Sequence, residues 1–288
     1  MAENTPQNYL VTSPGISATR WLSFALAQRP DVYITHGHHP LESIIKGDPD
    51  AEKDDSSSFT SGIELKAFYD SQTLSQVFER YREIMPEARA YGNIHSYTLG
   101  VLMQKASPEE LAEIRLLNLL RHPVSYLASH VALVRNAEAY PEVYSHYQQN
   151  MLAEALQRFP ELLLLDCPQD GEFLAFAVST LSVCKFADDF AHPGVRHVQM
   201  ERLTSETDAL QEFCEYLTGL PYQRELLQAH IDNGPVNAHR RQGREPRTPQ
   251  ETYEGWQTWQ QDMVHMMVPQ DVKDAFAAVG YDVSMMNL

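Results

Sequence analysis

The chain has 288 residues, of which 43% are apolar, and 22 basic against 39 acidic side chains give it a formal charge of −17. This length suits one large α/β domain or two small ones, and the acidic balance argues against nucleic acid or an anionic membrane as the main partner. The first eight residues are polar and unlike a signal peptide. No apolar run reaches the ~18 residues that a membrane helix needs, so a cytoplasmic protein is predicted.

Apolar runs alternate with segments of helical periodicity along the chain. Strands are predicted at 9–11, 31–35, 91–96, 115–120, 161–166 and 196–200, and helices at 18–27, 74–85, from 107, from 123 to 136, and at 140–159, 172–188, 209–217, 249–267 and 270–279. This alternation predicts an α/β fold with a mostly parallel central sheet flanked by helices on both faces. Ligands of such sheets bind at the carboxyl ends of the strands.

Two further features concern the organisation of the chain. Residues 1–288 are expected to form a single domain, with one charged, Ser-rich segment at 46–61 (KGDPDAEKDDSSSFTS) that predicts a mobile surface loop, either a lid near the site or an inert insertion. Cys167, Cys184 and Cys214 have neither metal nor disulfide spacing, and we expect them to be small buried apolar residues.

The N-terminal segment 9–29 indicates a phosphate site. A short apolar strand at 9–11 runs into the polar turn 12–17 (TSPGIS), and apolar residues at helical spacing follow from Ala18. A tight turn between a buried strand and a helix directs unpaired N–H groups and the positive end of the helix dipole to one point, which suits a phosphate.

A second segment, 116–130 (LLNLLRHPVSYLASH), places another phosphate-binding group at a strand end. The strand ends at Arg121, whose planar guanidinium can clamp a phosphate, and Pro123 begins a helix that carries Ser129 two turns along. The sheet topology predicts that residues 13–19, His95 and Arg121 lie along one edge.

Taken together, these segments resemble the sulfotransferase family that uses 3′-phosphoadenylyl sulfate (PAPS), and the chain is interpreted as a divergent member. The family has a phosphate loop after its first strand, matched loosely by residues 17–22 (SATRWL), and a motif RxPxxxxxS, matched from Arg121 to Ser129. Two later segments, 195–221 with Glu201 and Leu203, and 269–282 ending in VGYD, resemble the family's later elements in the same order. The resemblance implies a P-loop NTPase-like sulfotransferase fold.

The resemblance also implies roles for individual residues. Loop residues would hold the 5′-phosphate of PAPS, Arg121 and Ser129 would hold the 3′-phosphate with help from a basic loop, and a histidine after a strand would act as the catalytic base. His95 occupies that place in the order, and its alternative is a hydrogen-bonded structural histidine. The residues concerned are Gly15, Ser17, Ala18, Thr19 and Arg20 for the 5′-phosphate, and Arg240, Arg241 and Arg244 in the basic loop.

One position departs from the family pattern. Most members have Lys or Arg just before the loop serine, where the cation contacts the leaving phosphate, but this chain has Ile16, and Ala18 replaces a glycine. Either another residue supplies the charge or the transfer chemistry is weakened or lost. Arg20, one helical turn further on, is the nearest cation and the candidate catalytic replacement, and Lys66 and Lys105 are remoter ones.

Histidines also cluster after the second predicted strand, in the segment 36–40 (HGHHP). His36, His38 and His39 are interpreted as acceptor-loop residues that contact the substrate or simply lie at the surface. A metal site is the weakest interpretation, since no companion cysteine or acidic motif accompanies them, and no metal is expected.

The leading interpretation is therefore a sulfotransferase that moves a sulfuryl group from PAPS to a hydroxyl or amine of a small acceptor. A nucleotide-binding pseudoenzyme of the same fold is the alternative, motivated by Ile16. A P-loop kinase is disfavoured because no Gly-Lys-Ser/Thr sequence ends the loop. The sequence does not indicate the acceptor or the oligomeric state.

Overall fold

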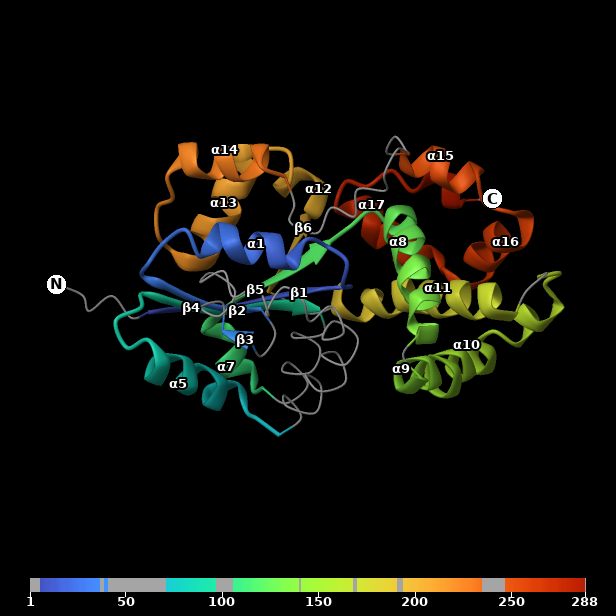
Figure 1. Cartoon of the computed structure of the whole chain (residues 1–288), viewed down its shortest axis with the longest axis horizontal. Coiled ribbons are helices and arrows are strands. Elements are labelled where there is room, and N and C mark those ends of the chain that lie inside the picture. Colours follow the sequence, from blue (N-terminus) through green and yellow to red (C-terminus); the bar gives the residue numbers. More distant parts are fainter. Residues whose placement is uncertain are drawn as a thin grey trace. The chain divides into compact units, whose positions relative to one another are not determined.

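The computed structural model describes residues 6–36, 39–40, 71–96, 106–139, 141–167, 170–190, 194–234 and 247–287. The predicted loop 46–61 lies outside these residues. Backbone contacts divide the chain into two compact units, which are described separately (Figure 1). Unit 1 comprises Met1–Leu120 with Pro193–Arg240, and unit 2 comprises Arg121–His192 with Arg241–Leu288.

Unit 1 is an α/β unit built on one sheet (Figure 1). Its elements are β1 (Gln7–Ser13), α1 (Thr19–Leu26), β2 (Val32–His36), β3 (His39–Pro40), α5 (Leu74–Ile84), β4 (Ala90–Ser96), α7 (Pro108–Ala112), β5 (Ile114–Leu120), β6 (Val195–Gln199), α12 (Met200–Leu203), α13 (Thr207–Thr218) and α14 (Arg224–Asp232). The strand order is β3-β2-β4-β1-β5-β6. All neighbours pair in parallel except β3, which is antiparallel to β2.

Alternate residues of the strands build a core on each face of this sheet. Tyr9 and Val11 of β1 pack with α1 and α13 on one face, whereas Leu10 packs with α5 and α7 on the other. Figure 1 shows these two helix layers on opposite sides of the strands. The predicted fold class, a mostly parallel sheet with helices on both faces, is thereby confirmed.

Unit 2 is helical in its described residues, and α11 contacts α8, α16 and α17. Its elements are α8 (Pro123–Asn136), η1 (Ala137–Ala139), α9 (Pro141–His146), η2 (Tyr147–Leu152), α10 (Ala153–Arg158), η3 (Pro160–Leu164), α11 (Asp170–Phe190), α15 (Pro249–Glu254), α16 (Thr258–Met267), α17 (Gln270–Ala278) and η4 (Ser284–Met286). Cys184 and, in unit 1, Cys214 are buried thiols as predicted, and Cys167 is half-buried.

Two sequence predictions in unit 2 are wrong. Residues 161–166 were expected to form a strand but lie largely in the 3-10 helix η3, with Leu162 buried and Leu163 and Leu164 exposed by 69% and 85%. An apolar run does not by itself distinguish a buried strand from a short helix that buries one residue. The single helix expected at 249–267 is divided into α15 and α16 by a break that begins at Gly255.

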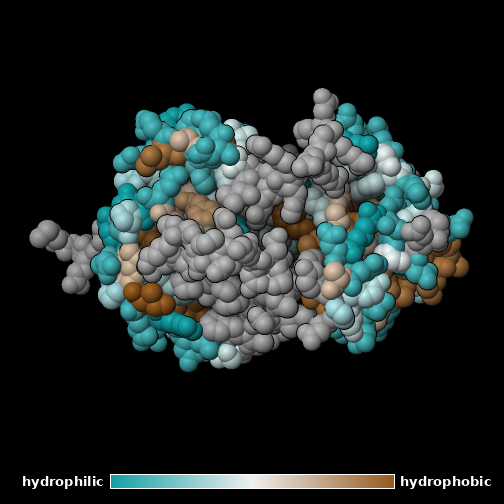
Figure 2. All heavy atoms as spheres, viewed as in Figure 1, coloured by the Kyte–Doolittle hydropathy of each residue, from teal (hydrophilic) through white to brown (hydrophobic). Residues whose placement is uncertain are grey.

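The surfaces of both units are mainly polar. Figure 2 shows hydrophilic residues over much of the visible side of each unit, with small apolar patches among them. The exposed large apolar residues include Ile84 and Leu226 in unit 1 and Leu163, Leu164 and Met266 in unit 2. Among the described residues, none of the helices combines the length and the hydropathy needed to cross a bilayer.

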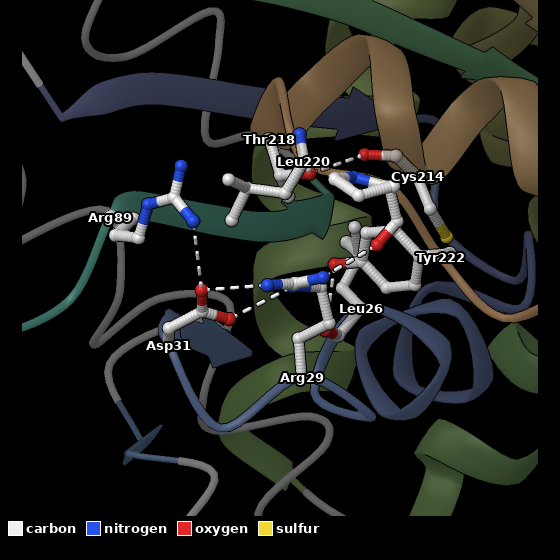
Figure 3. A network of polar contacts seen from close by, with 9 residues as sticks. Leu26, Arg29, Asp31, Arg89, Cys214, Thr218, Leu220 and Tyr222 are labelled. Atoms are coloured by element: carbon white, nitrogen blue, oxygen red, sulfur yellow. Dashed lines mark hydrogen bonds and ion pairs between the residues drawn. The ribbon is translucent and has the colours of Figure 1, made fainter. Parts of the chain in front are cut away.

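An ion-pair network fixes the turn between α1 and β2 (Figure 3). The Arg29 guanidinium donates to both carboxylate oxygens of Asp31, at 2.8 and 2.7 Å, and donates also to the Pro221 carbonyl at 2.6 Å. Arg89 approaches the same carboxylate at 3.7 Å. The side-chain hydrogen bonds from Arg29 lower the pKa of Asp31, despite an opposing effect of burial. The network therefore joins the amino-terminal ends of β2 and β4 to the segment that follows α13.

We predict that Asp31→Asn lowers the free energy of unfolding by about 1 kcal/mol at neutral pH, because the pair is bidentate but its side chains are 25% exposed. Since the folded-state pKa of Asp31 is lowered, this contribution is complete above the unfolded pKa of about 3.9 and is lost as the pH falls through the folded value. Urea unfolding at several pH values measures it. Asp208→Asn is the control, since its pair with Arg224 is 86% and 51% exposed, and an equal loss in both variants would contradict the prediction.

Candidate functional site

The turn between β1 and α1 has an unusual backbone. After β1 ends at Ser13, Gly15, Ile16 and Ala18 adopt positive φ angles of 86°, 52° and 56°. This left-handed conformation suits glycine, but it is disfavoured for alanine and more so for a β-branched residue such as isoleucine. Ile16 and Ala18, two residues apart, have positive φ, a backbone pattern in which successive N–H groups can turn towards one anion. The loop thus holds local strain next to a possible anion site.

Hydrogen bonds within the loop distinguish its two predicted hydroxyl ligands. The Gly15 N–H donates to the Ser13 hydroxyl at 3.1 Å, and the buried Ser17 hydroxyl donates to the Gly15 carbonyl at 2.9 Å. The Ser17 proton is therefore used inside the loop. The Thr19 hydroxyl, in contrast, reaches a side chain of another element, His36 of β2.

Helix α1 begins without a side-chain cap. Its N-cap residue is Ala18, and the first intrahelical bond runs from the Leu22 N–H to the Ala18 carbonyl at 2.9 Å. The N–H groups of Thr19, Arg20 and Trp21 consequently have no partner within the helix. They point in the direction of the positive end of the helix dipole, which favours an anion at this position.

Arg20 lies in this first turn and is half-buried. Its Nε is buried and makes no hydrogen bond, and we find no ion pair of its guanidinium within the described ranges. The next residue, Trp21, anchors the turn, since its indole N–H donates to the Gly234 carbonyl at 3.1 Å and its ring stacks on His230 at 4.3 Å. The helix start is thus held in place by Trp21 and offers one cation from Arg20.

Two histidines at strand ends meet the start of α1. His36, the last residue of β2, lies with its Nε2 3.1 Å from the Thr19 hydroxyl. The ring of His95, near the end of β4, meets the His36 ring edge-on at a centroid distance of 4.7 Å. Thr19, His36 and His95 therefore form a contiguous cluster at the carboxyl ends of the strands, where the sequence predicted residues 13–19 and His95.

Arg121 and Ser129 belong to unit 2. Arg121 directly follows β5, and Ser129 lies half-buried in α8. The sequence did not indicate a role for His122, which also lies between β5 and α8. Its Nδ1 accepts a hydrogen bond from the Val124 N–H at 3.2 Å, and its Nε2 donates one to the Asp282 carbonyl at 2.8 Å. His122 thus caps α8 and connects it to the C-terminal segment.

Most of the remaining predicted site residues are not among those that the structure describes. Residues 235–246, with Arg240, Arg241 and Arg244, and His38 are not among the described residues, and neither are Lys66 and Lys105. His39 is described for its backbone only, in β3 opposite His36. Within the described part of the chain, we find no group of three or more His, Cys, Asp or Glu side chains that could hold a metal ion.

The sheet register reveals a polar row that sequence reasoning did not assemble. Thr12 of β1 is in register with His95 of β4 and with Asn118 of β5, and Asn118 is in register with His197 of β6. The signal for it was present, because each residue is a polar position next to an apolar residue of its strand. The strand order, which decides that these positions are neighbours, was not available from the sequence.

Comparisons with known proteins give similar structures but no related sequence. No family model matches the chain, and no curated protein matches it. The chain is similar to a crystal structure of a sulfotransferase from Alicyclobacillus acidocaldarius, with 15% identity, a TM-score of 0.47 and coverage of 98% of this chain and 99% of that chain. It is also similar to the sulfotransferase domain of the Synechococcus PCC 7002 olefin synthase (15% identity, TM-score 0.46, coverage of 96% and 95%).

A third similar structure is the sulfotransferase domain from the curacin biosynthetic pathway, with 15% identity, a TM-score of 0.39 and coverage of 96% of this chain and 98% of that chain. At this identity, and with TM-scores below 0.5, the three likenesses do not decide the chemistry of this chain.

One histidine of α8, His130, belongs to the core of unit 2 and not to a site. It is 3% exposed, stacks on Tyr126, and donates from Nδ1 to the Ser179 hydroxyl at 2.9 Å, since that hydroxyl itself donates to the Ala175 carbonyl. Burial lowers the pKa of His130 to about 4.

We predict from this that unit 2 loses stability as the pH falls from about 6.5 to 4. In that interval His130 is protonated in the unfolded state but stays neutral in the folded state, where it is buried. The loss reaches about 3 kcal/mol at most, and urea unfolding at pH 7 and pH 5 measures part of it. His130→Gln should flatten this pH dependence, whereas His146→Gln, at an exposed position on α9, should not. Identical pH dependence in all three proteins would contradict the assignment.

Proposed function

We propose that the protein is a sulfotransferase that moves a sulfuryl group from PAPS to a hydroxyl or amine of a small-molecule acceptor. The observation that carries the proposal is the cluster of Thr19, His36 and His95 beside the uncapped start of α1. It combines an anion-binding helix start with an imidazole at the carboxyl ends of parallel strands. The ordered motifs of the sequence supply the choice of PAPS as the donor.

The helix start would bind the 5′-phosphate of the donor, which becomes the leaving group. The N–H groups of Thr19, Arg20 and Trp21 are not used within the helix, and the Thr19 hydroxyl can donate when His36 Nε2 carries a proton. Fixed donors of this kind stabilise negative charge that grows on the leaving phosphate in the transition state.

Arg20 would supply the positive charge that Ile16 lacks. Its guanidinium is on the first turn of α1, and its buried Nε has no hydrogen-bond partner, so it can form a charge-assisted bond to a phosphate without first breaking another one. A buried donor that stays unsatisfied costs about 1–3 kcal/mol, and a bound anion would remove that cost.

His95 would act as the general base. The acceptor oxygen attacks the sulfur, the bond from sulfur to the phosphate oxygen breaks, and 3′-phosphoadenosine 5′-phosphate leaves with the electron pair. The acceptor's hydroxyl proton passes to the neutral His95 imidazole, and His36, in ring contact with it, holds that ring in place.

Arg121 and Ser129 are proposed ligands of the 3′-phosphate, together with the basic residues Arg240, Arg241 and Arg244. A strand-end arginine offers the bidentate fork that suits a phosphate dianion.

The alternative function is a pseudoenzyme that binds the nucleotide without transferring sulfate. Ile16, which carries no charge and has a left-handed backbone, is the observation that favours it.

For Arg20, we predict that Arg20→Met weakens the binding of 3′-phosphoadenosine 5′-phosphate at least about tenfold, since a hydrogen bond to a charged group contributes about 1.5–3 kcal/mol. Isothermal titration calorimetry measures the affinity. Arg224→Met removes an arginine from an exposed ion pair and should leave it unchanged. Equal affinities in Arg20→Met and the unaltered protein would assign the cation role to another residue.

For His95, the expected result of His95→Ala is a fall in kcat of about 10²–10⁴-fold, the usual contribution of a general base, while the affinity for the nucleotide is retained. Transfer of radiolabelled sulfate from PAPS to a panel of phenols, alcohols and amines measures kcat, with His146→Ala as the control. Nucleotide binding without transfer in the unaltered protein would establish the pseudoenzyme. Absence of nucleotide binding would refute both functions.

A further inference from the structure

The polar row that crosses the sheet of unit 1 contains a side chain whose hydrogen-bonding capacity is unused. The row consists of His95, Thr12, Asn118 and His197, on the adjacent strands β4, β1, β5 and β6. Neighbouring strands lie about 4.8 Å apart, so Asn118 lies about 10 Å across the sheet from His95, with Thr12 between them.

All four residues belong to the same face of the sheet. Side chains alternate along a strand, and the residues two positions earlier, Leu10, Leu116 and Val195, pack in the core beneath α5 and α7. Residues adjacent to the row in each strand, Val11, Ile94, Leu117 and Val198, pack in the opposite core. The polar row is therefore the continuation of the α5 and α7 face towards the carboxyl ends of the strands.

Asn118 is the unusual member of this row. Asn118 is 0% exposed, and neither its Nδ2 nor its Oδ1 makes a hydrogen bond within the described part of the chain. Buried amide groups are nearly always paired, and each unpaired group costs about 1–3 kcal/mol in measured variants. A side chain with both atoms unpaired within the protein is suited to a partner that arrives from outside.

Asn93 provides the comparison within the same face. It is equally buried in β4, but its Nδ2 donates to the Tyr81 hydroxyl at 2.9 Å, and that hydroxyl is 2.9 Å from the Thr35 hydroxyl. Asn93 is thus a structural asparagine with partners inside the protein. Asn118 has the same chemistry and burial without them.

We propose that Asn118, with Thr12 beside it, binds a second hydroxyl group of a neutral acceptor whose reacting oxygen lies at His95, and that a water molecule occupies this position when no acceptor is bound. The inference rests on the proposed function for the role of His95. It assigns the acceptor to a class: uncharged molecules with at least two hydroxyl groups.

The chemistry of the amide selects this class. A hydroxyl both donates and accepts, so it satisfies Oδ1 and Nδ2 together. An ammonium group has only donors and leaves Nδ2 unpaired, whereas a carboxylate or phosphate has only acceptors and leaves Oδ1 facing an oxygen. Neither Asn118 nor Thr12, the two residues assigned to this hydroxyl, carries a charge that would compensate either ion.

The first test is a high-resolution crystal structure of the acceptor-free protein. The expected result is an ordered solvent oxygen within hydrogen-bond distance of both amide atoms of Asn118. An amide that bonds only to protein groups would overturn the proposal. This measurement does not depend on sulfate transfer, so it decides the Asn118 site even if the proposed function fails.

The second test compares Asn118→Leu with Asn93→Leu. The first removes two polar atoms that have no protein partner, at nearly constant volume, and should leave the melting temperature unchanged or raised, whereas the second breaks a network of bonds within the protein and should lower it. Equal lowering in both variants would show that Asn118 is structural and overturn the proposal.

The acceptor arm uses a matched pair of alcohols, 1,6-hexanediol and 1-hexanol, with PAPS as the donor. The unaltered protein should show a KM about tenfold lower for the diol, and Asn118→Leu should abolish that difference without changing the affinity for 3′-phosphoadenosine 5′-phosphate. Retained preference for the diol in Asn118→Leu would overturn acceptor binding at this residue. If the unaltered protein does not bind 3′-phosphoadenosine 5′-phosphate at all, the proposed function fails instead.

Discussion

The register of the central strand β1 is the constraint on which the site depends. β1 pairs in parallel with β4 from Gln7 to Ser13 and with β5 from Asn8 to Thr12, and both pairings are uninterrupted. A glycine secures this register, because a Cβ atom at Gly92 would lie 2.0 Å from the Tyr9 ring. One residue of slip would place that ring against a side chain and exchange the two faces of the strand. With the register fixed, Thr12 lies between His95 and Asn118. The strand β1 ends at Ser13, where the strained loop begins.

The loop that follows is held by contacts made elsewhere in unit 1. Left-handed Ile16 and Ala18 are unfavourable locally, but Trp21 fixes the first turn of α1 through the Gly234 carbonyl and the His230 ring. The burial of Trp21, which is 2% exposed, contributes about 2–3 kcal/mol or more to this anchoring. The helix start can therefore keep its N–H groups and Arg20 in one orientation before a ligand binds, which reduces the ordering cost of binding.

The sequence indicates the strands, the helices and the loop, because short apolar runs bounded by turn residues carry that information locally. It predicts β1, β2, β4, β5 and β6 to within one or two residues, and the presence of His36, His95 and Thr19 near strand or helix ends. It does not reveal that Trp21 bonds to Gly234, that Thr12 lies beside Asn118, or that α14 exists, since these depend on strand order and on contacts across some 200 residues. The strand predicted at 161–166 fails for the same reason, as the described residues of unit 2 include no strand that could pair with it.

The central claim is that the start of α1, with Arg20 in place of the missing loop cation, binds the 5′-phosphate of the donor. A crystal structure with 3′-phosphoadenosine 5′-phosphate bound tests it most directly. We expect the 5′-phosphate within hydrogen-bond distance of the Thr19 and Arg20 N–H groups and of the Arg20 guanidinium, with His95 facing the side from which an acceptor attacks. A 5′-phosphate bound away from residues 13–20, or an Arg20 side chain turned away from it, would rule out this role for the start of α1.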